Sequence, residues 1–301
     1  AFHRHLPDSA AYFRTAGALN MATSPKLRKR RIDSVSVFVG MAIVAVLLVW
    51  AFPFIWMLLG SVKPARDIIS DQLVIFFSPT LEHYREIFTR QPFSRFLLNS
   101  LIVASSVTVV TLTAGLLAAY GMSRFSAGGR WFELWVLATR MVPPVVLLIP
   151  LFLIFRVLGL INTLWALIIA DTTFLLSFVI WTMRSFFDEV PTSLDEAAMI
   201  DGASRMQAFR YVVLPIAVPG IVTSTILTFI FAWNEYLFAI VYATGTTSKT
   251  LPAAAADFIT GYAINWGPIF ASGTVIVLPV FLLSIVLQRY ITRGLMLGAI
   301  K

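Results

Sequence analysis

Long apolar runs alternate with short polar segments from residue 35 to residue 290 of this 301-residue chain. Each run is near or above the ~20 residues that an α-helix needs to cross a hydrocarbon core of about 30 Å. The pattern therefore predicts an all-α, polytopic membrane protein with six transmembrane helices. The predicted spans cover residues 35–60, 97–121, 132–156, 160–183, 214–242 and 267–289.

Polar segments flank this predicted transmembrane domain on both sides. Residues 1–34 are expected to form an N-terminal extension and residues 291–301 a carboxyl tail. Met21 and the five residues after it look like a natural start, so residues 1–20 are expected to have little structural role. The first apolar run is too long for the apolar region of a signal peptide, and no small-residue cleavage site follows it, so an uncleaved first helix is predicted.

Composition supports a membrane protein, because 58% of residues are hydrophobic and only 13% are charged. The formal charge of +8 comes from basic residues at the ends of apolar runs. Basic flanks of membrane helices explain this charge better than a nucleic-acid partner does. We therefore expect contact with membrane lipid and no nucleic-acid partner. Lys and Arg are in excess on the side of the amino terminus, which predicts that both termini and the loop at residues 192–213 are cytoplasmic.

Several kinds of chemistry lack the residues that they require. The chain has no cysteine, which excludes disulfides and thiolate metal sites, and its histidines, His3, His5 and His83, lie outside the apolar runs. No P-loop pattern occurs, so no nucleotide is expected to bind through such a loop in this chain. We expect neither a cofactor, nor a metal, nor an enzymatic activity.

The segment at residues 192–213 is the one long polar-rich interruption in the second half of the chain. Gly202 divides it and tolerates the positive φ that ends a helix sharply, so a helix, a turn and a second helix are predicted outside the membrane. Two pairs in the segment have the capping-box pattern, namely Ser193 with Glu196 and Ser204 with Gln207. One interpretation gives Glu196 no role beyond capping.

A second interpretation follows from a resemblance. The residues Glu196-Ala197-Ala198, Gly202 and Val212-x-Leu214-Pro215 resemble the EAA signature of binding-protein-dependent ABC importer permeases, except that Val212 replaces the usual isoleucine. In that family this loop is the coupling helix that docks into a cleft of the ATPase subunit. The resemblance implies that the ATPase-coupling residues are Glu196, Ala197, Ala198, Gly202, Met206, Phe209, Leu214 and Pro215.

The resemblance extends over nearly the whole chain from about residue 35. The maltose and trehalose branch of carbohydrate permeases is similar at Phe52-Pro53-Phe54-Ile55-Trp56-Met57, at residues 81–88, at Asn99-Ser100, at residues 140–144, at residues 231–235 and at residues 288–301. This similarity implies a permease of a bacterial inner membrane that works by alternating access. The implied partners are a homologous second permease subunit, two ATPase subunits that hold ATP and Mg, and an extracytoplasmic sugar-binding protein.

Ionisable and aromatic groups inside the predicted spans are candidates for a substrate path, because charges at membrane depth are costly. Arg140 and Asp171 lie on antiparallel neighbouring spans, where they are expected either to form a structural ion pair or to line the path. Trp233, Asn234 and Glu235 lie in the outer half of the fifth predicted span. They combine a flat apolar face with hydrogen-bonding groups, which suits a sugar, and the alternative is an interfacial aromatic belt.

A rival function is an ion-coupled secondary transporter or channel that works without an ATPase. In that case Arg140, Asp171 and Glu235 would form a charge relay. Secondary transporters often have two related halves with broken helices in corresponding positions, and no such symmetry is visible in this sequence. The sequence therefore favours the permease of an ABC importer.

Overall fold

The computed structural model describes residues 34–259 and 264–298. Within these ranges the regular elements are helices, together with one isolated bridge between Ile259 and Ile264, which confirms the all-α class. Residues 1–33 of the predicted N-terminal extension and the last three residues of the predicted tail lie outside the described residues. The chain divides into two parts, Ala1–Pro53 and Phe54–Lys301.

The described portion of the first part is a single apolar helix. It is the beginning of α2 (Ser34–Ser61), which continues into the second part. The most apolar 18-residue stretch of Val37–Ser61 has a mean hydropathy of 2.6, and no Asp, Glu, Lys or Arg occurs in the whole range. This helix is thus long and apolar enough to cross a membrane.

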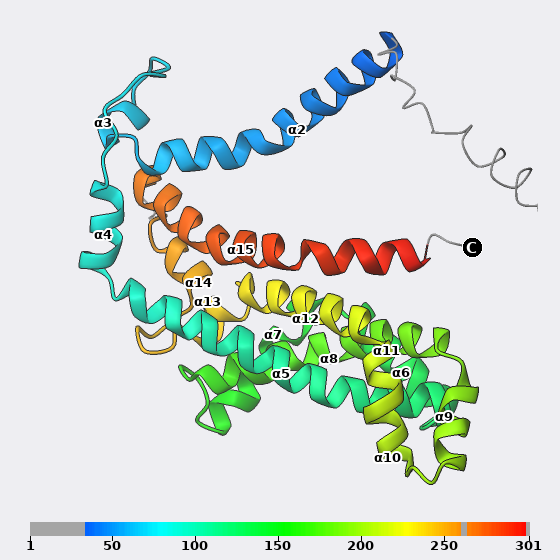
Figure 1. Cartoon of the computed structure of the whole chain (residues 1–301). Helices are drawn as coiled ribbons and strands as arrows, with labels where there is room; N and C mark the ends of the chain where they lie inside the picture. The colour runs from blue at the N-terminus through cyan, green and yellow to red at the C-terminus, as the bar shows by residue number, and fades with distance from the viewer. Residues whose placement is uncertain (1–33, 260–263, 299–301) are drawn as a thin grey trace, which may run out of the picture. The chain divides into compact units, whose positions relative to one another are not determined.

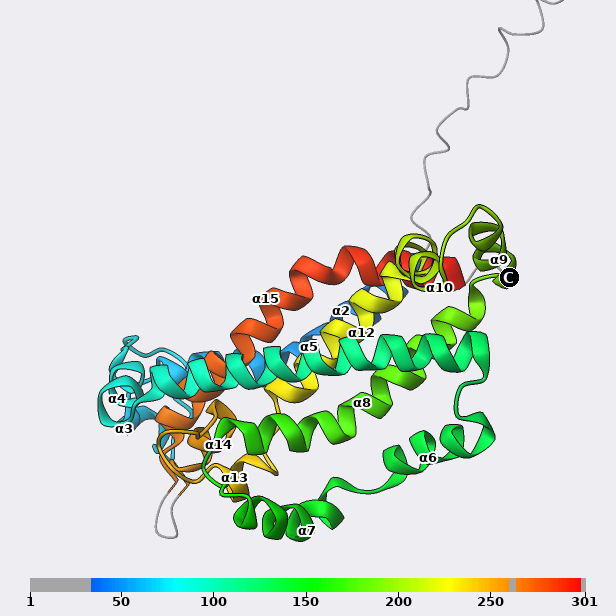
Figure 2. The ribbon, with the colours of Figure 1, turned by 90° about the horizontal axis from the view of Figure 1, so that it is seen from below.

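The second part is built around α5 (Phe93–Phe125), α8 (Leu164–Glu189), α12 (Val218–Trp233) and α15 (Trp266–Gly298). Helix α5 packs along α8 and α12, while α12 also contacts α15 (Figures 1 and 2). A β-carbon added at Gly115 of α5 would lie 2.7 Å from Val179 Cγ1, so the glycine lets α5 and α8 approach closely. Phe93, Phe96, Leu167 and Trp233 belong to the largest apolar core.

Short helices occupy the two ends of this bundle (Figure 2). One end carries α9 (Thr192–Ile200) and α10 (Arg205–Ala208). The opposite end carries α3 (Ala65–Ile68), α4 (Glu82–Arg90), α13 (Ala239–Tyr242) and α14 (Leu251–Ala256). The predicted coupling loop is therefore separated from α3 and α4 by the length of the bundle (Figure 2).

The third predicted span, 132–156, is not one helix. It is divided into α6 (Gly129–Met141) and α7 (Pro144–Val157), which meet at an angle of 96°. Pro143 and Pro144 lack backbone donors, and Val142, which precedes a proline, has an extended conformation. The proline pair thus breaks the helix.

The fifth predicted span, 214–242, also differs. Arg205–Ile216 and Val218–Trp233 meet at 78°, and α12 ends at Trp233 rather than at residue 242. The short stretch before the bend consists of the π-helical turn η1 (Phe209–Val213) and α11 (Leu214–Ile216).

The sixth helix is longer than predicted, since α15 continues past residue 289 to Gly298. By length and composition the described residues contain four membrane-spanning candidates, or up to six if each bent pair forms one span.

Candidate functional site

Residues 192–213 form the predicted helix, turn and helix. Gly202 has a φ of 92°, in the region that glycine adopts without strain. The Gly202 N–H donates to Met199 O at 3.1 Å and the Ala203 N–H donates to Ala198 O at 3.0 Å. These two bonds form a Schellman motif, which ends α9 sharply and turns the chain towards α10.

One of the two predicted capping boxes is present. The Ser204 N–H donates to Gln207 Oε1 at 2.7 Å, and the Gln207 N–H donates to Ser204 Oγ at 3.3 Å. The box predicted at Ser193 is wrong, because α9 begins at Thr192 after Pro191 and no side chain caps it. Ser193 therefore lies inside the first turn, and capping no longer explains Glu196.

The predicted coupling residues divide between an exposed and a buried face of the segment. Phe209 is buried against the bundle, with its ring centroid 4.5 Å from that of Tyr120 and 6.1 Å from that of Phe187. Its side chain is therefore not available to a partner, which differs from the expectation that it is a coupling residue. Ala198 and Leu214 are half-buried. The exposed members are Glu196, Ala197, Gly202, Met206 and Pro215.

A buried ion pair holds this segment to two bundle helices. Arg124 Nε, at the end of α5, lies 2.6 Å from Asp195 Oδ2 in the first turn of α9, and their side chains are only 5% and 7% exposed. Arg124 also donates to the carbonyl oxygens of Phe187 at 3.0 Å and Val190 at 2.9 Å, at the end of α8. We call these four residues the Arg124 clamp. It joins α5, α8 and α9 at one point.

Asp195 receives a further hydrogen bond in the clamp. Tyr120 of α5 donates its hydroxyl to Asp195 Oδ1 at 3.3 Å. Asp195 is recognisable from sequence as an acidic residue in the first turn of a helix, where it suits the positive end of the dipole. Arg124 was missed because it precedes Asp195 by 71 positions, and no local pattern links the two residues.

The expected ion pair between Arg140 and Asp171 is not formed. Arg140 is exposed, and its guanidinium carbon lies 5.4 Å from the ring centroid of Phe178. Phe178 follows Asp171 by two helical turns, about 10 Å at the usual rise per residue. Asp171 is buried, and its Oδ2 has no hydrogen-bond partner among the described residues.

The three residues at positions 233–235 are at a helix end. The ring of Trp233 is buried, and its Nε1 donates to Ile276 O of α15 at 2.9 Å. Asn234 donates to Ile230 O at 2.8 Å. Glu235 accepts hydrogen bonds from the backbone N–H groups of Phe238 at 2.7 Å and Ala239 at 3.1 Å. The carboxylate thus caps α13, while its role in a path remains a prediction.

Comparisons with known proteins agree on one class. Residues 111–296 match the family described as binding-protein-dependent transport system inner membrane component. The trehalose/maltose transport system permease protein MalG of Thermococcus litoralis is 34% identical over 279 residues, which cover 91% of this chain and 99% of that protein. The trehalose transport system permease protein SugB of Mycobacterium tuberculosis is 38% identical over 253 residues, 83% of this chain and 92% of that protein.

A solved structure supports the fold. A chain from the crystal structure of a bacterial ABC transporter involved in the import of the acidic polysaccharide alginate has a TM-score of 0.71 and 22% identity. The match covers 86% of this chain and 98% of that chain.

Replacing one member of the clamp should loosen α9. We expect Arg124→Met to lower stability by about 3–5 kcal/mol, because it leaves Asp195 as an unpaired buried charge. Asp195→Asn should cost less, because Arg124 keeps its bonds to Phe187 O and Val190 O. Hydrogen exchange of the α9 amides and the thermal midpoint measure both effects. Arg210→Met, at an exposed arginine of the same segment, is the control and should change neither.

Proposed function

The chain belongs to the binding-protein-dependent transport system inner membrane component family, and from this premise we propose that residues 192–213 couple it to an ATPase partner. It is a transmembrane permease subunit of an ABC importer, a transporter subunit and not an enzyme. Family membership supports this function and gives no support to the ion-coupled secondary transporter or channel.

The proposed cargo is a sugar or a sugar-like solute. Two relatives that align with most of this chain are named for trehalose/maltose and trehalose transport. The proposed assembly contains a homologous second permease subunit, two ATPase subunits that bind ATP and Mg, and an extracytoplasmic sugar-binding protein. In this proposal the membrane is a bacterial inner membrane, and both termini lie in the cytoplasm with the coupling segment.

The two faces of the coupling segment are the observation that carries the proposal. Its exposed face presents Glu196 together with the apolar side chains of Ile200 and Met206, which are 85% and 59% exposed. Its buried face is held to α5 and α8 by Asp195 and Phe209. A partner that pushes on the exposed face therefore displaces the ends of two long helices.

ATP binding by the partners and solute binding outside would act on the same equilibrium between inward-facing and outward-facing states. Each ligand shifts that equilibrium only by its difference in affinity for the two states. The Arg124 clamp makes α9 part of the moving body. It thus gives the ATPase a mechanical connection to the helices that would line the path.

Arg140, Asp171, Trp233, Asn234 and Glu235 remain the proposed substrate-path residues. The strongest of these is Asp171, because it is buried inside α8 without a partner for Oδ2 among the described residues. A carboxylate without a compensating bond is costly at membrane depth, so packing alone does not account for it. In this proposal Trp233 and Glu235 contribute to the substrate path at the outer end of α12.

Site-directed cross-linking tests the coupling proposal directly. The chain contains no cysteine, so a single introduced cysteine is the only thiol it supplies. Met206→Cys should cross-link to a cysteine placed in the cleft of the ATPase within the assembled transporter. Thr246→Cys, at an exposed position between α13 and α14 at the other end of the bundle, should not. Cross-linking of Thr246→Cys, or none at Met206→Cys in an intact assembly, would show that the proposed docking face is wrong.

Gly202 provides a test of the turn itself. We expect Gly202→Val to lower solute uptake by the reconstituted transporter about tenfold, because a positive φ costs a residue with a side chain about 1–2 kcal/mol. A β-carbon at Gly202 meets no atom within 4 Å, so the loss would come from the backbone and not from a clash. Gly202→Asn should retain more uptake, since asparagine tolerates this conformation better. Normal uptake by Gly202→Val would exclude the turn from coupling.

Asp171→Asn separates a path role from a structural role. The neutral amide is cheaper to bury, so the thermal midpoint should stay the same or rise. Uptake should fall if the carboxylate faces the solute. Ser177→Ala, which removes a buried hydroxyl from the same helix, is the matched control and should leave uptake unchanged. Full uptake by Asp171→Asn would remove it from the path.

A further inference from the structure

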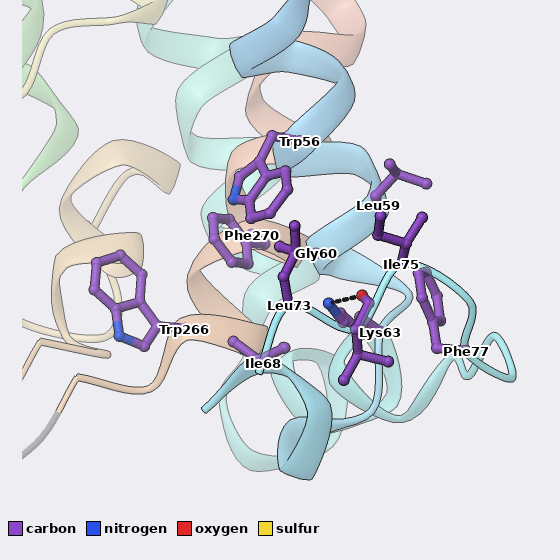
Figure 3. Close-up of a pocket in the computed structure, with 11 residues that line it drawn as sticks. Trp56, Leu59, Gly60, Lys63, Ile68, Leu73, Ile75, Phe77, Trp266 and Phe270 are labelled. Carbon is purple, nitrogen blue, oxygen red and sulfur yellow. Dashed lines mark hydrogen bonds between the residues drawn. The ribbon is translucent and has the colours of Figure 1, made fainter. Parts of the chain in front are cut away.

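An apolar pocket of about 300 Å³ lies where α2 and α15 meet the segment that follows α2. Trp56, Leu59 and Gly60 of α2 form one wall, and Trp266 and Phe270 of α15 form another (Figure 3). The remaining wall comes from residues 63–77. All of these residues belong to the second part of the chain.

Among the residues that the structure describes, Lys63 is the one charged residue that lines this pocket. Its ammonium group donates to Val74 O at 2.5 Å and lies 5.5 Å from the ring centroid of Phe77 (Figure 3). The hydrogen bond fixes the segment that closes the pocket. A lysine ammonium has three donors, so two remain for an anionic group at the mouth.

The position of the pocket indicates what covers its apolar surface. The membrane-span candidate Val37–Ser61 ends at it, and the candidate Trp266–Ile285 begins at it. Trp56 and Trp266 are 44% and 45% exposed, and tryptophan is enriched where helices pass from hydrocarbon into the interface. Acyl chains and phosphate groups are both available at this depth.

We propose that this pocket is a phospholipid site, in which one acyl chain lies between α2 and α15 and the lipid phosphate contacts Lys63. Leu73 and Ile75 project from the closing segment and are 69% and 68% exposed, so an acyl chain would cover surface that water would otherwise meet. A sugar fits this pocket poorly, because its lining offers few side-chain groups for hydrogen bonds to hydroxyls.

Photolabelling tests the site in the assembled transporter. The probe is a phosphatidylglycerol with a photoreactive acyl chain, in bilayers of phosphatidylethanolamine and phosphatidylglycerol. Label should be found by mass spectrometry on residues 73–77 and 266–270. Ile75→Glu should lower this labelling about tenfold, because a carboxylate replaces an apolar contact with the chain. Phe76→Glu is the matched control, since Phe76 is 96% exposed and does not line the pocket, and labelling should persist.

A second variant tests the headgroup contact. Lys63→Met keeps an apolar stem and removes the ammonium group, so labelling should fall for both phosphatidylglycerol and phosphatidylethanolamine probes. A fall in labelling with the phosphatidylglycerol probe alone would show that Lys63 responds to the net charge of the headgroup and not to its phosphate. That result would overturn the proposed contact between Lys63 and the lipid phosphate.

Three results would overturn the lipid site as a whole. The first is the absence of label at both segments, and the second is an equal loss of label in Ile75→Glu and Phe76→Glu. The third is unchanged labelling in Ile75→Glu together with lost stimulation of ATP hydrolysis by the sugar-binding protein. That outcome would make the pocket a protein docking surface. Co-purification of the partner subunits with each variant separates all three from a failure to fold.

Discussion

The need to pair every backbone polar group away from water accounts for several of the polar contacts in the described part of this protein. Helices satisfy that need internally, but each helix end or break leaves N–H and C=O groups without partners. Buried side chains supply the missing partners here. Arg124 donates to two carbonyls at the end of α8, Glu235 accepts from two N–H groups at the start of α13, and Asn99 donates to the carbonyls of Thr247 and Lys249.

These contacts also join helices to one another. Arg124 connects α9 to α5 and α8, and the Tyr242 hydroxyl donates to Leu148 O at 2.7 Å, which connects α13 to α7. The coupling segment ends with the π-helical turn η1, and the bend near Ala217 separates it from α12. In the proposed cycle, the coupling segment thus moves with α5 and α8, while the bend absorbs its displacement relative to α12.

Local signals in the sequence predicted local structure well. Hydropathy identified the apolar helices, and Gly202 marked a turn that needs a positive φ. Ser204 and Gln207 formed the capping box that their spacing predicts. Averaged hydropathy predicted the helix boundaries poorly, because an average over many residues does not show where Pro143 and Pro144 break a helix. The Arg124 clamp could not be predicted from the sequence, because it depends on how α5, α8 and α9 pack and not on a pattern within any one of these helices.

The charges inside the predicted spans show why sequence position alone does not separate structural from functional groups. Arg140 and Asp171 have complementary charges, yet Arg140 lies over the Phe178 ring and Asp171 is buried without it. Arg124 and Glu235 are explained by the backbone groups that they satisfy. Asp171 has no such explanation among the described residues, because its Oδ2 is buried without a partner. A fold selected for stability alone would gain from a neutral residue at this position, and for this reason we propose that the carboxylate serves the substrate path.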